Sequence, residues 1–122
     1  MANILVIDDE TEVRYAIRAV LEDQGHDVSE AETGTAGLSA IADAPDPYDL
    51  VICDLKMPKR DGIAFYKALA DSVPAMSKRV MFVTGDVAGT NAEQFLNETG
   101  CRWLAKPFRL GDLLRAVREE LS

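Results

Sequence analysis

The segment Ile4-Leu5-Val6-Ile7-Asp8-Asp9-Glu10 decides the fold, because a short apolar run stops there at consecutive carboxylates. The branched apolar side chains of residues 4–7 are typical of a strand that is buried on both faces of a sheet. The segment therefore predicts a buried strand that ends in an acidic turn.

Beyond the acidic turn, the apolar residues change to the period of a helix. They are spaced i, i+3, i+4, i+7 and i+8, at Val13, Ala16, Ile17, Val20 and Leu21. This spacing gives one apolar face of a helix, and Gly25 provides a stop. The chain thus opens as strand, acidic turn and helix.

The same alternation continues to the end of the chain. Further strands are expected at Asp27–Ala31, Leu50–Cys53, Arg79–Val83 and Trp103–Ala105, and further helices at Gly34–Ala42, Gly62–Ala70, Thr90–Thr99 and Leu110–Leu121, with longer loops at 42–49 and 71–78. Alternating strands and helices predict an α/β, doubly wound, five-stranded parallel sheet with five helices on both faces, because right-handed crossovers place the helices there. We expect a single domain over residues 1–122.

Size and composition agree with a globular domain and exclude several classes of protein. The 122 residues are 48% hydrophobic and 28% charged, and the apolar runs are far shorter than the roughly 20 residues of a membrane span. No basic and apolar leader follows Met1, so we expect a cytoplasmic protein without contact to a membrane. The net charge of −8 would repel a phosphate backbone, which argues against direct nucleic-acid binding.

Polar residues follow several of the expected strands and would meet at one edge of the sheet. They are Asp8, Asp9 and Glu10 after the first strand, Asp54 after the third, Thr84 after the fourth and Lys106 after the fifth. Ligands of open parallel sheets bind at this carboxyl edge. Crowded carboxylates favour a hard cation such as Mg²⁺, which leaves room for a phosphoryl oxygen. A carboxylate attacking that phosphoryl group would form an acyl phosphate.

The sequence blocks around these residues resemble those of the response regulator receiver domain (CheY-like) of two-component signal transduction. The matching blocks are Ile4–Glu10, Asp54-Leu55-Lys56-Met57-Pro58 with Asp61-Gly62, Val83-Thr84-Gly85 and Lys106-Pro107-Phe108. They occur in the family's order and spacing and cover nearly the whole chain. The resemblance implies a flavodoxin-like sheet with the strand order 2-1-3-4-5.

The resemblance also implies a role for each matching residue. Asp54 would be the phosphoacceptor, receiving a phosphoryl group from a histidine kinase or a histidine phosphotransfer protein. Mg²⁺, with Mn²⁺ as an alternative, would be bound by Asp8, Asp9, Asp54 and the backbone carbonyl of Lys56. Thr84 and Lys106 would contact the phosphoryl group. The family further implies a cis peptide bond before Pro107.

The resemblance also implies a phosphoprotein that works through a conformational switch. Phosphorylation would draw Thr84 inward and change the face built by residues 90–99, 103–105 and 110–121, with Trp103 at the family's aromatic switch position. Tyrosine or phenylalanine is more usual there, and Arg60 replaces a common apolar residue. Lys56 and Asp86 occupy positions that tune dephosphorylation in the family.

Other interpretations remain open at this stage. Asp8, Asp9 and Glu10 could also be an ordinary acidic start of a helix, where negative charge interacts favourably with the helix dipole. Glu10 itself fits a first-turn helix residue better than a metal ligand. A magnesium-dependent phosphohydrolase and a docking module that is never phosphorylated are alternatives, although Lys56 stands where such a hydrolase needs a carboxylate. A receiver is not an enzyme on a separate substrate, since it catalyses only its own phosphorylation and dephosphorylation.

The parent chain and the partners are also open. The parent would be a stand-alone response regulator, a transcription factor or a hybrid sensor histidine kinase, and the block Val83–Asp86 resembles hybrid-kinase receivers most. The downstream partner is unknown, and dimerisation is an open option.

Overall fold

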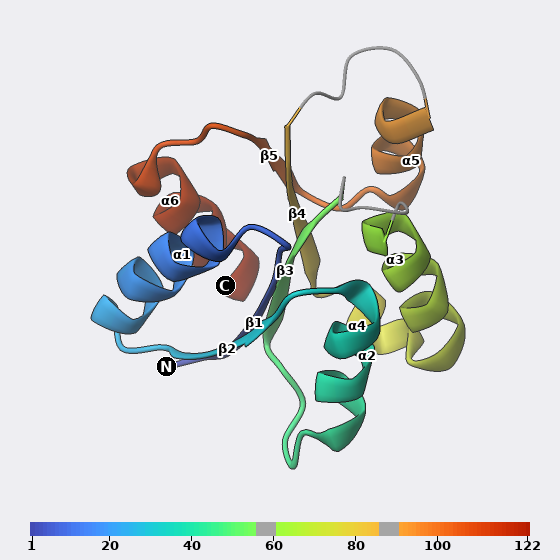
Figure 1. The fold of residues 1–122 in the computed structure, drawn as a ribbon, viewed down its shortest axis with the longest axis horizontal. Helices are drawn as coiled ribbons and strands as arrows, with labels where there is room; N and C mark the ends of the chain where they lie inside the picture. Colours follow the sequence, from blue (N-terminus) through green and yellow to red (C-terminus); the bar gives the residue numbers. More distant parts are fainter. Residues whose placement is uncertain (56–60, 86–90) are drawn as a thin grey trace.

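The computed structural model describes residues 1–55, 61–85 and 91–122. Its core is a parallel sheet in the order β2-β1-β3-β4-β5 (Figure 1). The strands are β1 (Asn3–Ile7), β2 (Asp27–Ala31), β3 (Leu50–Asp54), β4 (Val80–Thr84) and β5 (Trp103–Ala105). All neighbouring strands pair in parallel, so the predicted sheet and its strand order are confirmed.

Helices cover both faces of this sheet (Figure 1). One face carries α1 (Thr11–Asp23) and α6 (Leu110–Leu121), and the other carries α2 (Gly34–Asp43), α3 (Asp61–Ser72), α4 (Pro74–Ser77) and α5 (Asn91–Thr99). The expected helical segments are all present, with ends that differ from the prediction by a few residues.

The described residues contain one helix more than the five expected, because α4 lies in the segment 71–78 that was expected to be a loop. This helix is a single turn that begins at Pro74, whose ring already fixes a helical φ. The Ser77 hydroxyl donates to the Pro74 carbonyl at 2.7 Å, and Met76 is buried. A turn this short contains no repeat of the helical period, so apolar spacing cannot predict it.

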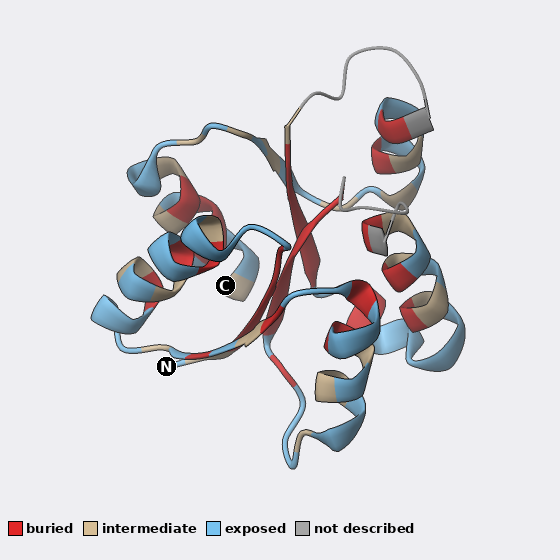
Figure 2. Cartoon of the chain, in the orientation of Figure 1, coloured by how far each residue is buried: buried red, intermediate tan, exposed pale blue. Residues whose placement is uncertain are grey.

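The sheet separates two apolar cores. Alternate strand residues such as Leu5, Cys53 and Phe82 pack toward α2, α3, α4 and α5, whereas Ile4, Ile52 and their neighbours pack toward α1 and α6. Figure 2 shows β3 and β4 buried along their whole length. Because both faces are covered, only the strand ends remain accessible for chemistry.

Gly62 allows α3 to begin directly against the end of β3. A Cβ atom at this position would lie 2.7 Å from both the Cα and the carbonyl oxygen of Leu55, and it would also overlap the carbonyl oxygen of Asp54. Only glycine therefore permits this close approach without moving backbone.

Three sequence expectations fall outside the described residues: the Lys56 carbonyl as a metal ligand, Arg60 and Asp86. Within the described ranges, the expected cis peptide bond between Lys106 and Pro107 is confirmed. The described helices include none with the length and apolar character that crossing a membrane requires.

Candidate functional site

The carboxyl ends of four strands bring the predicted site residues to one edge of the sheet. Asp8 directly follows β1, Asp54 and Thr84 end β3 and β4, and Lys106 directly follows β5. Backbone hydrogen bonds extend the sheet to this edge, from Asp8 N–H to Ala31 and from Lys106 N–H to Thr84, at 3.1 and 2.7 Å. The expected convergence of these residues is therefore present.

The ammonium group of Lys106 contacts three carboxylates at this edge. Its Nζ atom lies 2.8 Å from Asp8 Oδ2, 3.1 Å from Asp54 Oδ2 and 3.1 Å from Glu10 Oε1. The side chains of Asp8 and Asp54 are buried, whereas that of Glu10 is mostly exposed. A charge-assisted contact between such buried groups is far less screened by water than a surface ion pair.

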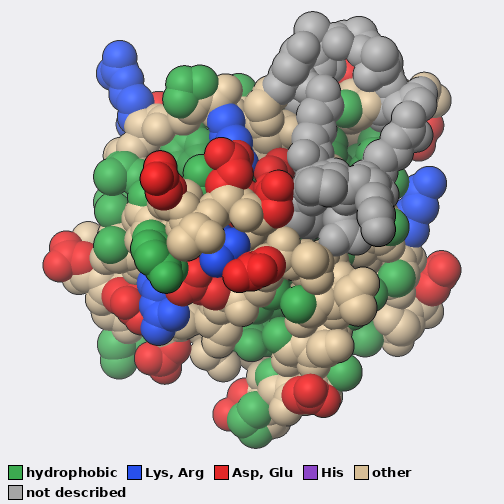
Figure 3. Space-filling view, viewed as in Figure 1, with side chains coloured by type: hydrophobic (Ala, Val, Ile, Leu, Met, Phe, Trp, Pro, Cys, Tyr) green, Lys and Arg blue, Asp and Glu red, His purple; other side chains and the backbone are tan. Residues whose placement is uncertain are grey.

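Four carboxylates form the acidic group of this edge. One oxygen from each of Asp8, Asp9, Glu10 and Asp54 lies within 4.8 Å of the others. Asp8 and Asp54 are buried beneath Asp9 and Glu10, which are exposed. Figure 3 shows acidic side chains gathered near the centre of this face. Hard carboxylate oxygens with an open, solvated side suit Mg²⁺, which keeps several of its waters.

Burial and neighbouring charges shift the pKa values of Asp8 and Lys106 at this edge. Burial raises the pKa of the Asp8 carboxyl, and the nearby Asp54 adds to this, while hydrogen bonds from Lys106 and the Glu10 N–H oppose it. Burial opposes the charged form of Lys106, but hydrogen bonds and charges from Asp8 and Asp54 outweigh it and raise its pKa. Lys106 is thus firmly cationic, and its charge is shared between the two buried carboxylates of Asp8 and Asp54.

Thr84 has an unusual environment for a hydroxyl group. It is fully buried, and its Oγ1 atom has no hydrogen-bond partner among the residues that the structure describes. A buried polar group without a partner costs roughly 1–3 kcal/mol. The Thr84 hydroxyl thus lies at the end of β4 with a hydrogen-bonding capacity that no described residue uses.

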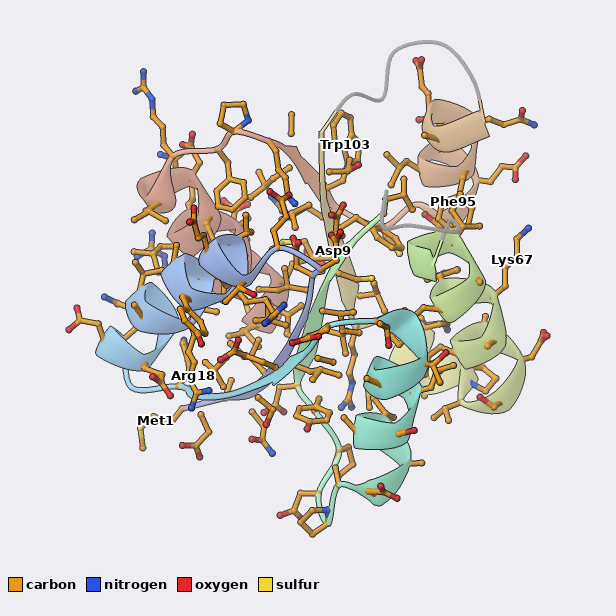
Figure 4. All side chains as sticks on the ribbon, in the orientation of Figure 1. Met1, Asp9, Arg18, Lys67, Phe95 and Trp103 are labelled. Carbon is orange, nitrogen blue, oxygen red and sulfur yellow. The ribbon has the colours of Figure 1, made fainter. Side chains whose placement is uncertain are left out.

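Trp103 is 37% exposed on β5. It shares a small surface pocket with Glu93, Leu96 and Asn97 of α5. Figure 4 shows its ring above the strand ends, on the side toward α5, and Asp9 at the end of β1. In this state the indole therefore belongs to the outer surface of β5 and α5.

Sequence reasoning missed two features of the site. Glu10 is the N-cap residue directly before α1, one position ahead of the first turn in which it was expected, and its carboxylate also pairs with Lys106. Arg14 is buried and donates to the backbone carbonyl of Asp8. A sequence signal for Arg14 did exist, since it lies three residues before Ile17 and seven before Leu21 on the apolar stripe, where a charge needs a partner.

Comparisons with known proteins give a consistent result. A family model described as the response regulator receiver domain matches residues 4–118. The chain is 30% identical to the transcriptional regulatory protein DltR of Streptococcus agalactiae over 115 residues, which are 94% of this chain and 50% of DltR. It thus spans about half the length of that relative.

The chain also matches two proteins from Brucella abortus, and it covers very different shares of their lengths. Identity is 29% to the sensor kinase CckA, over 99% of this chain and 13% of CckA. It is 26% to the response regulator receiver protein CpdR, over 99% of this chain and 98% of CpdR.

Among solved structures, the chain is similar to a response regulator receiver domain protein from Clostridium thermocellum. The TM-score is 0.85 at 33% identity, covering 99% of this chain and 94% of the other.

Proposed function

Since the chain belongs to the response regulator receiver domain family, we propose that it accepts a phosphoryl group on Asp54 within a two-component phosphorelay. One observation carries the proposal: Lys106 joins Asp54 to Asp8 beside a buried Thr84 hydroxyl that lacks a partner among the described residues. A nucleophile, a cation and a hydroxyl donor are the groups that phosphoryl transfer to a carboxylate needs.

In the proposed reaction, a carboxylate oxygen of Asp54 attacks the phosphorus of a phosphohistidine. The new O–P bond forms as the P–N bond breaks, and the electron pair of that bond remains on the imidazole nitrogen. Lys106 neutralises the charge on the phosphoryl oxygens from its place 3.1 Å from Asp54, and Thr84 donates its hydroxyl hydrogen. The domain acts on itself and on no separate substrate.

The residues at this edge fit the divalent cation that the family uses. Asp8, Asp9 and Asp54 would hold Mg²⁺, with Mn²⁺ as an alternative, and the Lys56 carbonyl would complete the protein ligands. When bound, the cation reduces the negative charge that otherwise repels an incoming phosphoryl group. Asp8 and Asp54 are buried and fixed by Lys106, whereas Asp9 faces solvent.

Phosphorylation would be read out on the face formed by α5, β5 and α6. A phosphoryl group on Asp54 offers the Thr84 hydroxyl an acceptor, and movement of Thr84 would leave space beside β5. Trp103 lies on this face, where its indole shares a pocket with α5. We therefore include Thr84 and Trp103 in the switch.

The proposed phosphodonor is a histidine kinase or a histidine phosphotransfer protein, and an unidentified protein reads the output face. We propose a cytoplasmic domain that binds neither nucleic acid nor a membrane directly, consistent with its net charge of −8. Relatives of this chain include a transcriptional regulatory protein, a sensor kinase and a short receiver protein. A transcription factor, a hybrid sensor histidine kinase and a stand-alone response regulator therefore all remain proposed parents.

The test is phosphorylation by acetyl phosphate with and without Mg²⁺, followed by intact mass and by the fluorescence of Trp103. The expected result is a mass gain of one phosphoryl group that requires both Mg²⁺ and Asp54, with Asp54→Asn as the control. Equal uptake by the Asn variant would refute the site. Uptake without a fluorescence change would remove Trp103 from the switch, and no uptake or beryllofluoride response at all would favour a docking module.

A further inference from the structure

Arg14 is a buried charged residue that the proposed transfer reaction does not use. Only 5% of it is exposed, although it lies on α1 next to the acidic edge. Its guanidinium donates to the Asp8 carbonyl at 2.6 Å and to Glu30 Oε1 at 2.9 Å. The Thr11 hydroxyl lies 3.3 Å away. Burying a charge in this way requires partners of this number and geometry.

The contacts of Arg14 complete the fixation of Asp8. The Asp8 N–H is held by the Ala31 carbonyl of β2, and its side-chain Oδ1 accepts from the Glu10 N–H at 2.9 Å. Arg14 holds the remaining backbone group, the Asp8 carbonyl. That carbonyl belongs to the peptide unit joining Asp8 to Asp9, so its direction also sets where the exposed Asp9 side chain begins.

The charge of Arg14 is balanced locally. Arg14 and Arg18 share Glu30, while Glu32 lies 3.5 Å from Arg14 and Glu22 lies 3.1 Å from Arg18. Three carboxylates thus surround two guanidinium groups. The guanidinium therefore adds little net positive charge at the acidic edge. Its influence on a bound cation should come mainly from the placement of the Asp8 and Asp9 oxygens, since planar donors fix two acceptors at once.

We propose that Arg14 is a positioning residue: its bridge between Glu30 and the Asp8 carbonyl holds the Asp8–Asp9 turn in the arrangement that binds the divalent cation. This rests on the proposed function. Groups behind the direct ligands of a metal commonly set its affinity by orienting those ligands. Arg14 would do so through the backbone, without touching the cation.

The experiment measures cation binding without phosphorylation. Mn²⁺ alone is titrated into the wild type, and the EPR signal of the free ion gives the bound fraction, with Mg²⁺ as competitor. Arg14→Met should weaken binding by about tenfold. Arg14→Lys keeps the charge and reaches one acceptor, so its affinity should lie between those of Arg14→Met and the wild type. Arg18→Met is the matched control, since Arg18 shares Glu30 but lies away from Asp9 (Figure 4) and should bind Mn²⁺ within about twofold of the wild type.

Acetyl phosphate kinetics provide a second readout. In Arg14→Met, the Mg²⁺ concentration for half-maximal phosphorylation should rise about tenfold, while the rate at saturating Mg²⁺ stays within about threefold. Ile17→Val loosens the packing of the same helix and should change stability without moving the Mg²⁺ midpoint. This separates positioning from a general loss of stability. If Arg14→Met does not fold, Arg14→Lys carries the test.

Two results would overturn the inference. One is Mn²⁺ binding by the Arg14 variants that is equal to or tighter than that of the wild type, because a purely electrostatic role would strengthen binding when positive charge is removed. The other is a Mg²⁺ midpoint that shifts equally in Ile17→Val. Failure of the proposed function looks different, since the wild type itself would then show no phosphorylation that depends on Asp54.

Discussion

Gly62→Ala tests how closely the phosphoacceptor depends on the packing of α3. The new Cβ would lie 2.7 Å from both the Leu55 Cα and the Leu55 carbonyl oxygen, and it would overlap the Asp54 carbonyl oxygen. Ordinary contacts between carbon atoms are about 3.5–4.0 Å, so the neighbouring atoms must separate by roughly 1 Å. All of these neighbours are backbone atoms, and a side-chain rotation cannot relieve the overlap.

The substitution should therefore cost about 1–3 kcal/mol of unfolding free energy, the usual range for an overpacked core. It should also displace the peptide that carries Asp54. A misplacement near 1 Å in a reacting group can reduce a rate about a hundredfold, so acetyl phosphate should label the variant far more slowly than the wild type.

Urea unfolding and intact-mass kinetics measure these two effects separately. Gly111→Ala in α6 is the matched control, since a Cβ there would meet no described atom within 4 Å outside its chain neighbours and its own helix backbone. It should stabilise the protein by up to about 1 kcal/mol and leave phosphorylation unchanged. A Gly62→Ala variant with wild-type stability and wild-type labelling would show that the backbone adapts without cost, and would refute the reasoning.

Two further predictions concern Thr84 and Glu30. Thr84→Val replaces a buried hydroxyl without a described partner by a methyl group, so it should stabilise the unphosphorylated protein by about 1–2 kcal/mol in urea unfolding. It should also reduce the response of Trp103 fluorescence to beryllofluoride. A destabilised variant would reveal a hydrogen bond of Thr84 in the resting state. Partial burial opposes ionisation of Glu30, but hydrogen bonds from Arg18 and Arg14 outweigh it and lower the pKa of Glu30 below the ordinary 4.5. The ion pairs of Glu30 therefore stabilise the fold above pH 4.5, and this stabilisation is lost as the pH falls through the lowered folded-state pKa. The stability difference between wild type and Glu30→Gln should accordingly be constant at neutral pH and shrink in acid, and a difference that grows on acidification would contradict the assigned ion pairs.

The sequence was sufficient to predict the sheet and the residues at its edge. Strands such as Ile4–Ile7 are apolar throughout, and each ends abruptly at a polar residue, so the alternation of elements and the convergence of Asp8, Asp54, Thr84 and Lys106 follow from the parallel topology. The strand order, in contrast, came from resemblance to a family. Nothing in the apolar pattern itself chooses which strand lies beside which.

Features that depend on contacts between distant segments were not predictable in the same way. The one-turn helix α4 is too short to show a period, and the tight approach of Gly62 to β3 depends on how far apart two elements pack. Arg14 is an intermediate case. Its position on the apolar stripe marks it as buried, but only the structure identifies the Asp8 carbonyl and Glu30 as its partners.

The site residues suggest why one edge of the sheet serves as a switch. In the resting arrangement, Lys106 is shared among Asp8, Glu10 and Asp54, and the Thr84 hydroxyl has no described partner. These features make the edge costly to the fold, because burial already raises the pKa of Asp8 and no described residue satisfies the buried hydroxyl. In the proposed phosphorylated state, the phosphoryl oxygens provide acceptors for both Lys106 and Thr84. The groups that are unfavourably placed in the resting arrangement are thus the groups that would gain hydrogen-bond acceptors on phosphorylation. Phosphorylation would therefore favour a different arrangement of Thr84 and its neighbours on β5.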